Sequence, residues 1–199
     1  MRDDNVLFCV ILLFIIVICS RMYYLSDEVQ LKCVISSVDG NRYCVRDRSQ
    51  LEAASDMLAD VNRRCKTLII FLVEKFPDRK DVQRLNDKFK TVKITETLPT
   101  SEHTAYSENK GEKLAFCLNK SKDEHTKLID INTLTFVALH ELSHIMTISE
   151  GHKRIFWENF KFLLDNAVEV GIYDPVDYKN NPKKYCGMEL TDNPYYDIV

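Results

Sequence analysis

One pentapeptide constrains this chain more than any other segment: His140-Glu141-Leu142-Ser143-His144. Positions i and i+4 of an α-helix lie on one face, a single turn apart, so a helical backbone brings the imidazoles of His140 and His144 toward one point. Glu141 then lies about 100° further round the helix. The pattern therefore predicts a helix that presents two metal-ligating nitrogen atoms together with one carboxylate.

The residues ahead of the pentapeptide favour this helix. Residues 131–139 form an apolar helical run, and Asp130 or Asn132 is its candidate N-cap. The His-Glu-x-x-His spacing is typical of zinc hydrolases, in which the two imidazoles bind the metal and the glutamate is the general base. The competing interpretation is that both histidines are core residues that bind nothing.

A catalytic zinc site needs a third protein ligand and an open fourth position. His152 is the candidate, because the preceding Gly151 accepts a positive φ without steric cost and can end the helix and return the chain toward the metal. Glu158 and Glu169, on the helix expected next, are the competing ligands, since a distant glutamate is the third ligand in some zinc hydrolases. The expected Zn²⁺ ligands are therefore His152 and the two histidines of the pentapeptide.

Three segments together resemble the WLM group of zinc metallopeptidases and, more loosely, the SprT-like ones. They are the pentapeptide 140–144, Gly151-His152 and the aromatic pair Phe156-Trp157. The resemblance covers roughly residues 90–190 and is sharpest over residues 137–157. This chain departs from the best-known members in its hydrophobic N-terminus and in lacking recognisable C-terminal partner-binding motifs, so a role in repair of DNA–protein crosslinks is not implied.

The resemblance implies an α+β fold of the minimal zincin type, with a small, mainly antiparallel sheet packed on helices. In that fold His140, His144 and His152 would bind zinc and Glu141 would be the catalytic base. The implied activity is hydrolysis of peptide bonds.

An apolar segment lies at the N-terminus. Residues 6–19 contain no charged or strongly polar side chain, and with residues 20–25 the segment approaches the roughly 20 residues that span a bilayer. We expect an uncleaved, single-pass transmembrane helix within residues 1–25; a signal peptide and a buried core helix are the alternatives. Arg2 and Arg21 nearly cancel in the positive-inside count, so the orientation stays open.

The remaining length of this 199-residue chain fits one domain. Residues 26–48 are expected to form a small hairpin or a stalk, and residues 49–199 the zincin-like domain. Within that domain the periodicity predicts helices over 49–76, 78–90 and 154–170, a strand over 91–98, and a hairpin of residues 104–108 and 113–119. The chain from Asp174 onward, rich in proline and tyrosine, is expected to be irregular.

Several side chains outside the pentapeptide are candidates for smaller roles. Residues 115–118 are the candidate strand for binding an extended peptide, with a plain core strand as the alternative. His103 and His125 are expected to be solvated loop residues. Asp165 and Glu169 are either hydrogen-bond acceptors for a ligand imidazole or surface charges. The candidates for an oxyanion-stabilising residue are three tyrosines, among which the sequence does not choose: Tyr173, Tyr178 and Tyr185.

The cysteines and the net charge limit which kinds of site and partner are expected. Five of the seven cysteines lie outside the apolar segment and form no C-x-x-C motif, so neither a thiolate metal site nor a redox motif is indicated. Cys33 and Cys44 would pair in an oxidising compartment; scattered free thiols are the alternative. With a net charge of −3 and no basic stripe, nucleic acid is not an expected partner.

The sequence thus predicts a membrane-anchored zinc metallopeptidase that acts on a peptide or protein substrate. Glu141 would take a proton from a water acidified by the metal and return it to the leaving amine. The hypothesis from another class is a catalytically silent, membrane-tethered structural or adaptor protein with the same fold. An unchanged Glu141 favours the enzyme, because an inactive descendant has no need of the base. The substrate, the oligomeric state and the compartment stay open.

Overall fold

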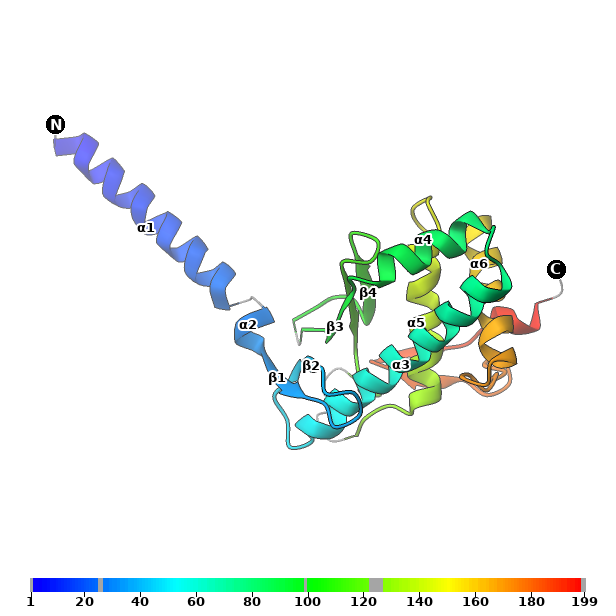
Figure 1. The fold of residues 1–199 in the computed structure, drawn as a ribbon. Helices are drawn as coiled ribbons and strands as arrows, with labels where there is room; N and C mark the ends of the chain where they lie inside the picture. The colour runs from blue at the N-terminus through cyan, green and yellow to red at the C-terminus, as the bar shows by residue number, and fades with distance from the viewer. Residues whose placement is uncertain (1, 25–26, 99, 122–126, 198–199) are drawn as a thin grey trace.

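The N-terminal segment forms one long helix that projects from the body of the protein (Figure 1). The computed structural model describes residues 2–24, 27–98, 100–121 and 127–197. Helix α1 (Arg2–Tyr24) is followed by the single-turn α2 (Asp27–Gln30). Residues Val6–Tyr24 are long and apolar enough to cross a membrane, and none of that stretch is buried. The alternative of a buried core helix is therefore wrong, whereas Leu25, at the end of the expected anchor, lies outside the described residues.

A five-stranded sheet forms one side of the body, in the order β1-β2-β3-β5-β4. Its strands are β1 (Leu31–Ile35), β2 (Arg42–Arg46), β3 (Lys93–Glu96), β4 (Ala105–Glu108) and β5 (Lys113–Phe116).

The sheet is mixed, which corrects the expected, mainly antiparallel arrangement. The pairs β1–β2 and β4–β5 are antiparallel hairpins, whereas β2–β3 and β3–β5 are parallel. Two helices connect β2 to β3, and a helical crossover returns the chain to the same end of the sheet and produces a parallel neighbour. The hairpin of β4 and β5 then places its second strand beside β3, so β4 forms the edge.

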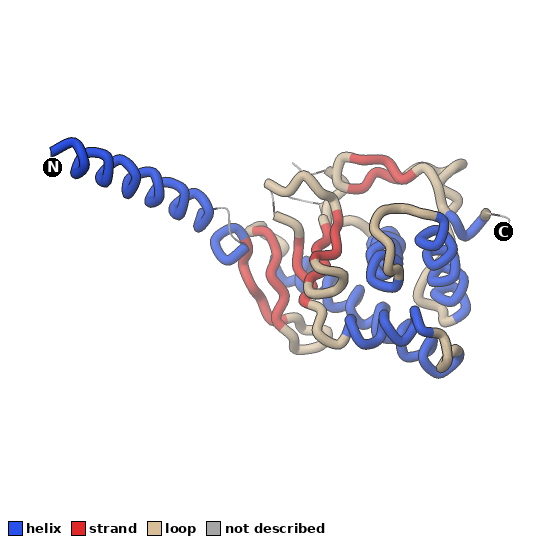
Figure 2. The backbone as a smooth tube through the Cα atoms, turned by 90° about the horizontal axis from the view of Figure 1, so that it is seen from above, coloured by secondary structure: helices blue, strands red, loops and turns tan. Residues whose placement is uncertain are grey.

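Four helices make up the other side of the body (Figure 2). They are α3 (Leu51–Lys75), α4 (Lys80–Phe89), α5 (Ile131–Met146) and α6 (Arg154–Glu169), which confirms the helices expected from periodicity. Helix α5 contacts α3, α4, α6 and β4, so nearly all of its residues after the first turn are buried. A helix enclosed on so many sides holds its few partly exposed side chains in fixed positions.

Residues 31–46 belong to the same sheet as the rest of the body. Arg46 and Arg48 extend from the end of β2 toward the buried carboxylate of Glu96 on β3, with 3.6 Å between Arg46 Nε and Glu96 Oε1. Arg46 Nε also donates to the carbonyl oxygen of Thr97 at 2.7 Å. Buried charges need such partners, and this network ties the first hairpin to the centre of the sheet.

The C-terminal chain contains a second sheet, which corrects the expectation of irregular structure. Strands β6 (Lys183–Tyr185) and β7 (Met188–Leu190) form a hairpin, followed by a short 3₁₀ helix, η1 (Pro194–Tyr196). The two turn residues, Cys186 and Gly187, have φ values of 49° and 81°. Positive φ at both central positions is the requirement of the tight I′ turn that matches strand twist.

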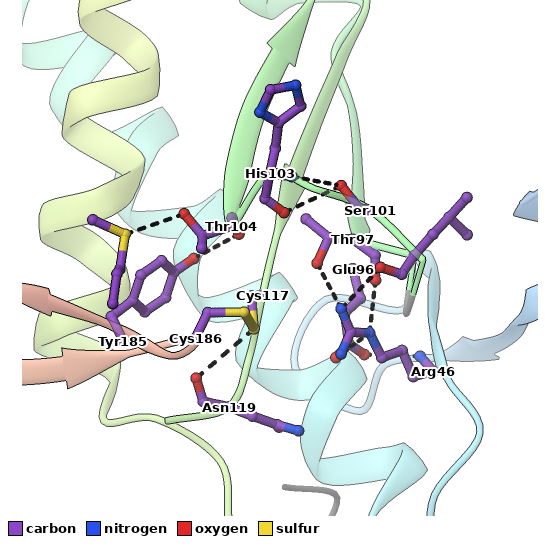
Figure 3. The surroundings of a disulfide bond; sticks show 12 residues. Arg46, Glu96, Thr97, Ser101, His103, Thr104, Cys117, Asn119, Tyr185 and Cys186 are labelled. Carbon is purple, nitrogen blue, oxygen red and sulfur yellow. Dashed lines mark hydrogen bonds and ion pairs between the residues drawn. A yellow bond between two sulfur atoms is a disulfide. The ribbon is translucent and has the colours of Figure 1, made fainter. Parts of the chain in front are cut away.

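Two disulfides cross-link the body. Cys33 pairs with Cys44 across β1 and β2, and Cys117 pairs with Cys186, which joins the end of β5 to the C-terminal hairpin (Figure 3). Five cysteines lie outside the N-terminal apolar segment, and the alternative of scattered free thiols is wrong for four of them. The fifth, Cys65, is a buried free thiol. The pairing of Cys117 with Cys186 has no signature in the local sequence.

Candidate metal centre

Helix α5 carries the first two candidate ligands. Asp130 is its N-cap: one side-chain oxygen accepts a hydrogen bond from the backbone N–H of Thr133 at 2.9 Å. One helical turn separates His140 from His144, and their ring centroids lie 5.0 Å apart. Both side chains are partly exposed, whereas their neighbours on α5 face the core.

The third histidine returns to the same place from the loop after α5. Nε2 of His152 lies 3.1 Å from Nε2 of His140. Within the part of the chain that the structure describes, one ligand nitrogen each from His140, His144 and His152 lie within 4.8 Å of one another. Gly151 has a φ of 73°, as its expected role in a turn requires, but α5 ends earlier, at Met146. Gly151 therefore turns the loop toward the site and does not terminate the helix.

Two aromatic side chains at the start of helix α6 contact the three histidines. The buried ring of Phe156 lies 4.4–4.9 Å, centroid to centroid, from all three imidazoles. Trp157 Nε1 donates to the backbone carbonyl of His152 at 3.1 Å. Phe156 thus packs against all three imidazoles, and Trp157 holds the backbone of His152.

The acidic side chains of α6 are engaged elsewhere. Glu158 pairs with Arg154, Asp165 with Lys161, and Glu169 with Lys75. None of these carboxylates belongs to the histidine cluster. The arrangement favours His152 over Glu158 and Glu169, and Asp165 and Glu169 are surface charges.

Two basic side chains hold the chain between the second and third histidines. Lys110, in the turn between β4 and β5, donates through Nζ to the backbone carbonyls of Thr147, Ile148 and Ser149. Arg84 donates to the carbonyl of Met146 at 2.6 Å. Met146 is the last residue of α5 and the other three carbonyls follow it, where no further helical turn supplies donors, so the two cations satisfy them and hold the loop.

Glu141 lies beside the histidines with its side chain buried. Burial raises the pKa of its carboxyl group to about 7, and a hydrogen bond from the backbone N–H of Ser107 on β4 opposes this rise. A carboxyl group with a pKa near neutrality can both take up and release a proton at neutral pH.

The surroundings of His140 and His144 favour the neutral imidazole. Burial, followed by the proximity of the other histidines, lowers the pKa of His140 to about 3. Burial, then His152 and Lys110, lowers that of His144 to about 4. Neutral imidazole is the form that binds a metal, so at neutral pH these nitrogens need not lose a proton first.

A cleft of about 460 Å³ opens over the three histidines and Glu141. Its opposite wall is edge strand β4, through Ala105, Tyr106 and Ser107. The expectation that residues 115–118 form the peptide-binding strand is wrong, because β5 pairs with β3 on one side and β4 on the other, and Ala115–Leu118 are buried. The hydrogen-bonding edge next to the cleft belongs to β4.

His103 is exposed in a loop, as expected, and His125 lies outside the described residues. Tyr173 and Tyr178 are buried against Phe136. Tyr185 is buried close to the site, but its hydroxyl donates to the carbonyl of Thr104 at 3.2 Å (Figure 3).

Sequence reasoning named Trp157 within the aromatic pair but missed two other contributors, Ser107 and Lys110. Each acts through a backbone contact with a segment distant in sequence or in another element, and no spacing rule reports such contacts. The chain also offers Tyr106 in the cleft wall, whose position depends on which strand forms the edge.

The comparison with solved structures gives Wss1 from Saccharomyces cerevisiae, with a TM-score of 0.49, 15% identity, and coverage of 63% of this chain and 86% of that chain. A Wss1 mutant from S. pombe has a TM-score of 0.41 and 19% identity, with coverage of 61% and 91%. No family model matches the chain.

Relatives in sequence are viral. "Uncharacterized protein R325" of Acanthamoeba polyphaga mimivirus is 27% identical over 185 residues, which cover 90% of this chain and 93% of the relative. "Uncharacterized protein 136R" of Invertebrate iridescent virus 6 is 39% identical over 70 residues, or 35% and 38% of the two chains. "Uncharacterized protein 042R" of Invertebrate iridescent virus 3 is 30% identical over 145 residues, or 72% and 84%. On this last match, the chain belongs to the family of viral proteins that includes protein 042R of Invertebrate iridescent virus 3.

Proposed function

We propose that the protein is a membrane-anchored, zinc-dependent peptidase. One observation carries the proposal: three imidazoles converge beside a buried carboxyl group in a cleft that an edge strand also lines. The histidines would be the metal ligands, Glu141 the base, and β4 the strand that binds the substrate. The resemblance of the segment 137–157 to WLM peptidases points to the same chemistry.

The residues fit zinc by their chemistry and by their spacing. Zinc prefers nitrogen and sulfur ligands, and a tetrahedral site with metal–nitrogen distances of about 2.0–2.1 Å has ligand atoms about 3.3 Å apart. The 3.1 Å between Nε2 of His140 and Nε2 of His152 agrees with this separation. Three ligands from the protein leave one position open, as catalytic zinc sites do.

Glu141 would move the proton in the reaction. When bound, zinc acidifies water and polarises a carbonyl group. Glu141 would accept a proton from the attacking water and deliver it to the amine nitrogen of the departing peptide. Burial raises the pKa of this carboxyl group, which makes its carboxylate a stronger base for the first step.

The free edge of β4 would orient the substrate. An extended peptide can pair with an edge strand through backbone hydrogen bonds, irrespective of its side chains. Ala105–Ser107 line the same cleft as Glu141 and His140, so a peptide added there would pass beside the histidine cluster. The substrate is then an extended segment of polypeptide.

Helix α1 would anchor this activity to a membrane as a single span. Its apolar length supports the anchor, as does its exposed surface, since none of Val6–Tyr24 is buried by the residues that the structure describes. We accordingly divide the chain into an anchor of residues 1–25, a connecting hairpin of residues 26–48 and a catalytic domain of residues 49–199, with the hairpin joined to the sheet of that domain.

The test uses the full chain, purified in detergent and loaded with zinc. We expect one zinc ion per chain and zinc-dependent cleavage of unfolded casein. Glu141→Gln should retain the zinc and lose the cleavage, because an amide cannot accept the proton. A chain without stoichiometric zinc would refute the metal site, and a Glu141→Gln variant of undiminished activity would refute the role of the base. Zinc binding with no hydrolysis would favour the silent adaptor.

A further inference from the structure

A second, smaller cavity lies next to the cleft. It has a volume of about 170 Å³ and shares Ala105, His140 and Glu141 with the cleft. The two spaces therefore meet at the catalytic groups. Its remaining walls are Thr104, Phe136, Val137, Tyr185, Met188 and Leu190.

Apart from His140 and Glu141, the side chains that line this cavity are mostly apolar. The Tyr185 hydroxyl donates to the carbonyl of Thr104, and the Thr104 hydroxyl is 3.4 Å from the sulfur of Met188 (Figure 3). The polar atoms of these wall residues are thus already paired with one another. Among the wall residues outside the shared three, none carries a charge. Such a cavity favours an apolar guest, because a polar one would lose its hydrogen bonds to water without replacement.

The volume sets the size of the guest. An apolar protein cavity of about 150 Å³ holds a benzene molecule. A space of about 170 Å³ therefore accommodates one leucine, methionine or phenylalanine side chain.

The C-terminal hairpin supplies three of the walls, Tyr185, Met188 and Leu190. It is fastened to the sheet by the disulfide between Cys117 and Cys186 (Figure 3). The backbone N–H of Cys186 also donates to the carbonyl of Asn119 at 3.0 Å. The hairpin is only three residues on each side, and a hairpin this short has little stability of its own. The disulfide is therefore one of the links that keep this wall in place.

We propose that this cavity binds one large apolar side chain of the substrate, next to the bond that is cleaved, and that the hairpin held by Cys117–Cys186 makes the protein selective for it. The inference rests on the proposed peptidase function and adds the class of substrate: unfolded polypeptide carrying leucine, methionine or phenylalanine at one position beside the cleavage site.

The first experiment measures which residues flank the bonds that the protein cleaves. The zinc-loaded full chain in detergent digests unfolded casein without reductant, and mass spectrometry identifies the cleaved bonds. We expect leucine, methionine and phenylalanine to be enriched at one position flanking the cleaved bond, by roughly 10-fold or more over alanine, the range that apolar pockets reach. Cleavage without such enrichment would overturn the cavity's role and leave the peptidase function standing.

Variants then connect the preference to the cavity. Val137→Phe, from α5, and Leu190→Trp, from the hairpin, fill the space and should reduce the enrichment at least 5-fold. The double variant Cys117→Ser/Cys186→Ser should also reduce it, since the hairpin wall is released. Val38→Phe, an equal enlargement on the exposed turn between β1 and β2, should leave activity and preference unchanged. An enrichment that survives both filling variants would contradict the proposal.

A binding measurement separates failure of this proposal from failure of the peptidase function. Fluorescent peptides made of serine and threonine, with a single central leucine or alanine, are titrated into the zinc-loaded Glu141→Gln variant. We expect the leucine peptide to bind at least 5-fold more tightly, and Leu190→Trp to abolish the difference. If no casein is cleaved but this difference is present, the peptidase function falls and the cavity stands; equal binding of the two peptides overturns the cavity.

Discussion

Nε2 of His152 lies 3.1 Å from Nε2 of His140, although the two residues are twelve positions apart in sequence and only His140 lies on α5. The loop between them brings the third imidazole to the first two, and it is held from several sides. Lys110 binds three of its carbonyls, and Trp157 binds the carbonyl of His152 itself. The metal site proposed here thus depends on a loop as much as on a helix.

His152→Ala should weaken zinc binding more than the roughly 10- to 100-fold that loss of an outer partner costs, because it removes a direct ligand. Competition with a chelating indicator measures the affinity. Glu158→Gln is the matched control on α6 and should bind zinc as the wild type does. If instead Glu158→Gln binds zinc weakly and His152→Ala binds it as the wild type does, then Glu158 and not His152 is the third ligand.

Lys110→Met should lower zinc affinity by about 10-fold, because the loop carrying His152 loses the ammonium that holds its carbonyls. Lys110→Arg, which retains donors and charge, should recover most of that loss. Lys90→Met, at a lysine paired with Asp87 on the surface, is the control. Chemical denaturation of the metal-free variants checks the fold. Unchanged zinc affinity in Lys110→Met would show that the loop needs no such support.

Asp130→Ala should reduce the free energy of unfolding by about 1 kcal/mol at pH 7, the usual cost of losing an N-cap. Burial tends to raise the pKa of Asp130, but hydrogen bonds from Thr133 and Lys183 outweigh it and lower the pKa below its ordinary value. A depressed carboxyl pKa stabilises the fold above the unfolded pKa, about 3.9, and this contribution is lost as the pH falls through the folded value.

The difference between wild type and Asp130→Ala should therefore be constant above about pH 5 and shrink below about pH 4. Urea denaturation across this range measures it. Asp87→Ala, at an exposed carboxylate on α4, should show little effect at any pH. If the difference in the free energy of unfolding between wild type and Asp130→Ala grows as the pH falls, the pKa of Asp130 is not lowered by folding.

The two disulfides predict that residues 27–199 lie in an oxidising compartment, with the N-terminus on the reducing side of the membrane. In isolated membranes, alkylation without reductant should leave four cysteines unmodified until dithiothreitol is added: Cys33, Cys44, Cys117 and Cys186. Protease added to sealed vesicles reports which side the domain occupies. Full alkylation of all four under native, non-reducing conditions would place the domain in the reducing compartment.

Reduction of Cys117–Cys186 should also destabilise the body by about 2–4 kcal/mol, because this disulfide closes a long loop. Thermal unfolding of Cys117→Ser/Cys186→Ser measures the loss. Cys65→Ser is the control for a cysteine without a disulfide partner, although its burial makes a small loss of its own expected. Equal stability of wild type and the double variant would show that the hairpin is held by its other contacts.

The sequence by itself determined the features that have a local period or a local length. The i, i+4 spacing of His140 and His144 and the apolar stripe of α3 follow from 3.6 residues per turn, and the apolar run of α1 follows from its length. The candidate ligand set could also be named, because Gly151 and His152 follow the helix closely. These features depend on residues that are close in sequence, so the sequence pattern alone predicts them.

Only the tertiary structure decided which strand forms the edge and which cysteines pair. Strands β4 and β5 are one hairpin, and their sequences do not say which of them pairs with β3; burial of β5 between two strands leaves β4 beside the cleft. Cys117 and Cys186 meet across 69 residues, and Lys110 reaches carbonyls more than 35 positions away. Such contacts arise when whole elements pack together, because the energy of burial depends on shape and neighbours in space and leaves no period in the sequence.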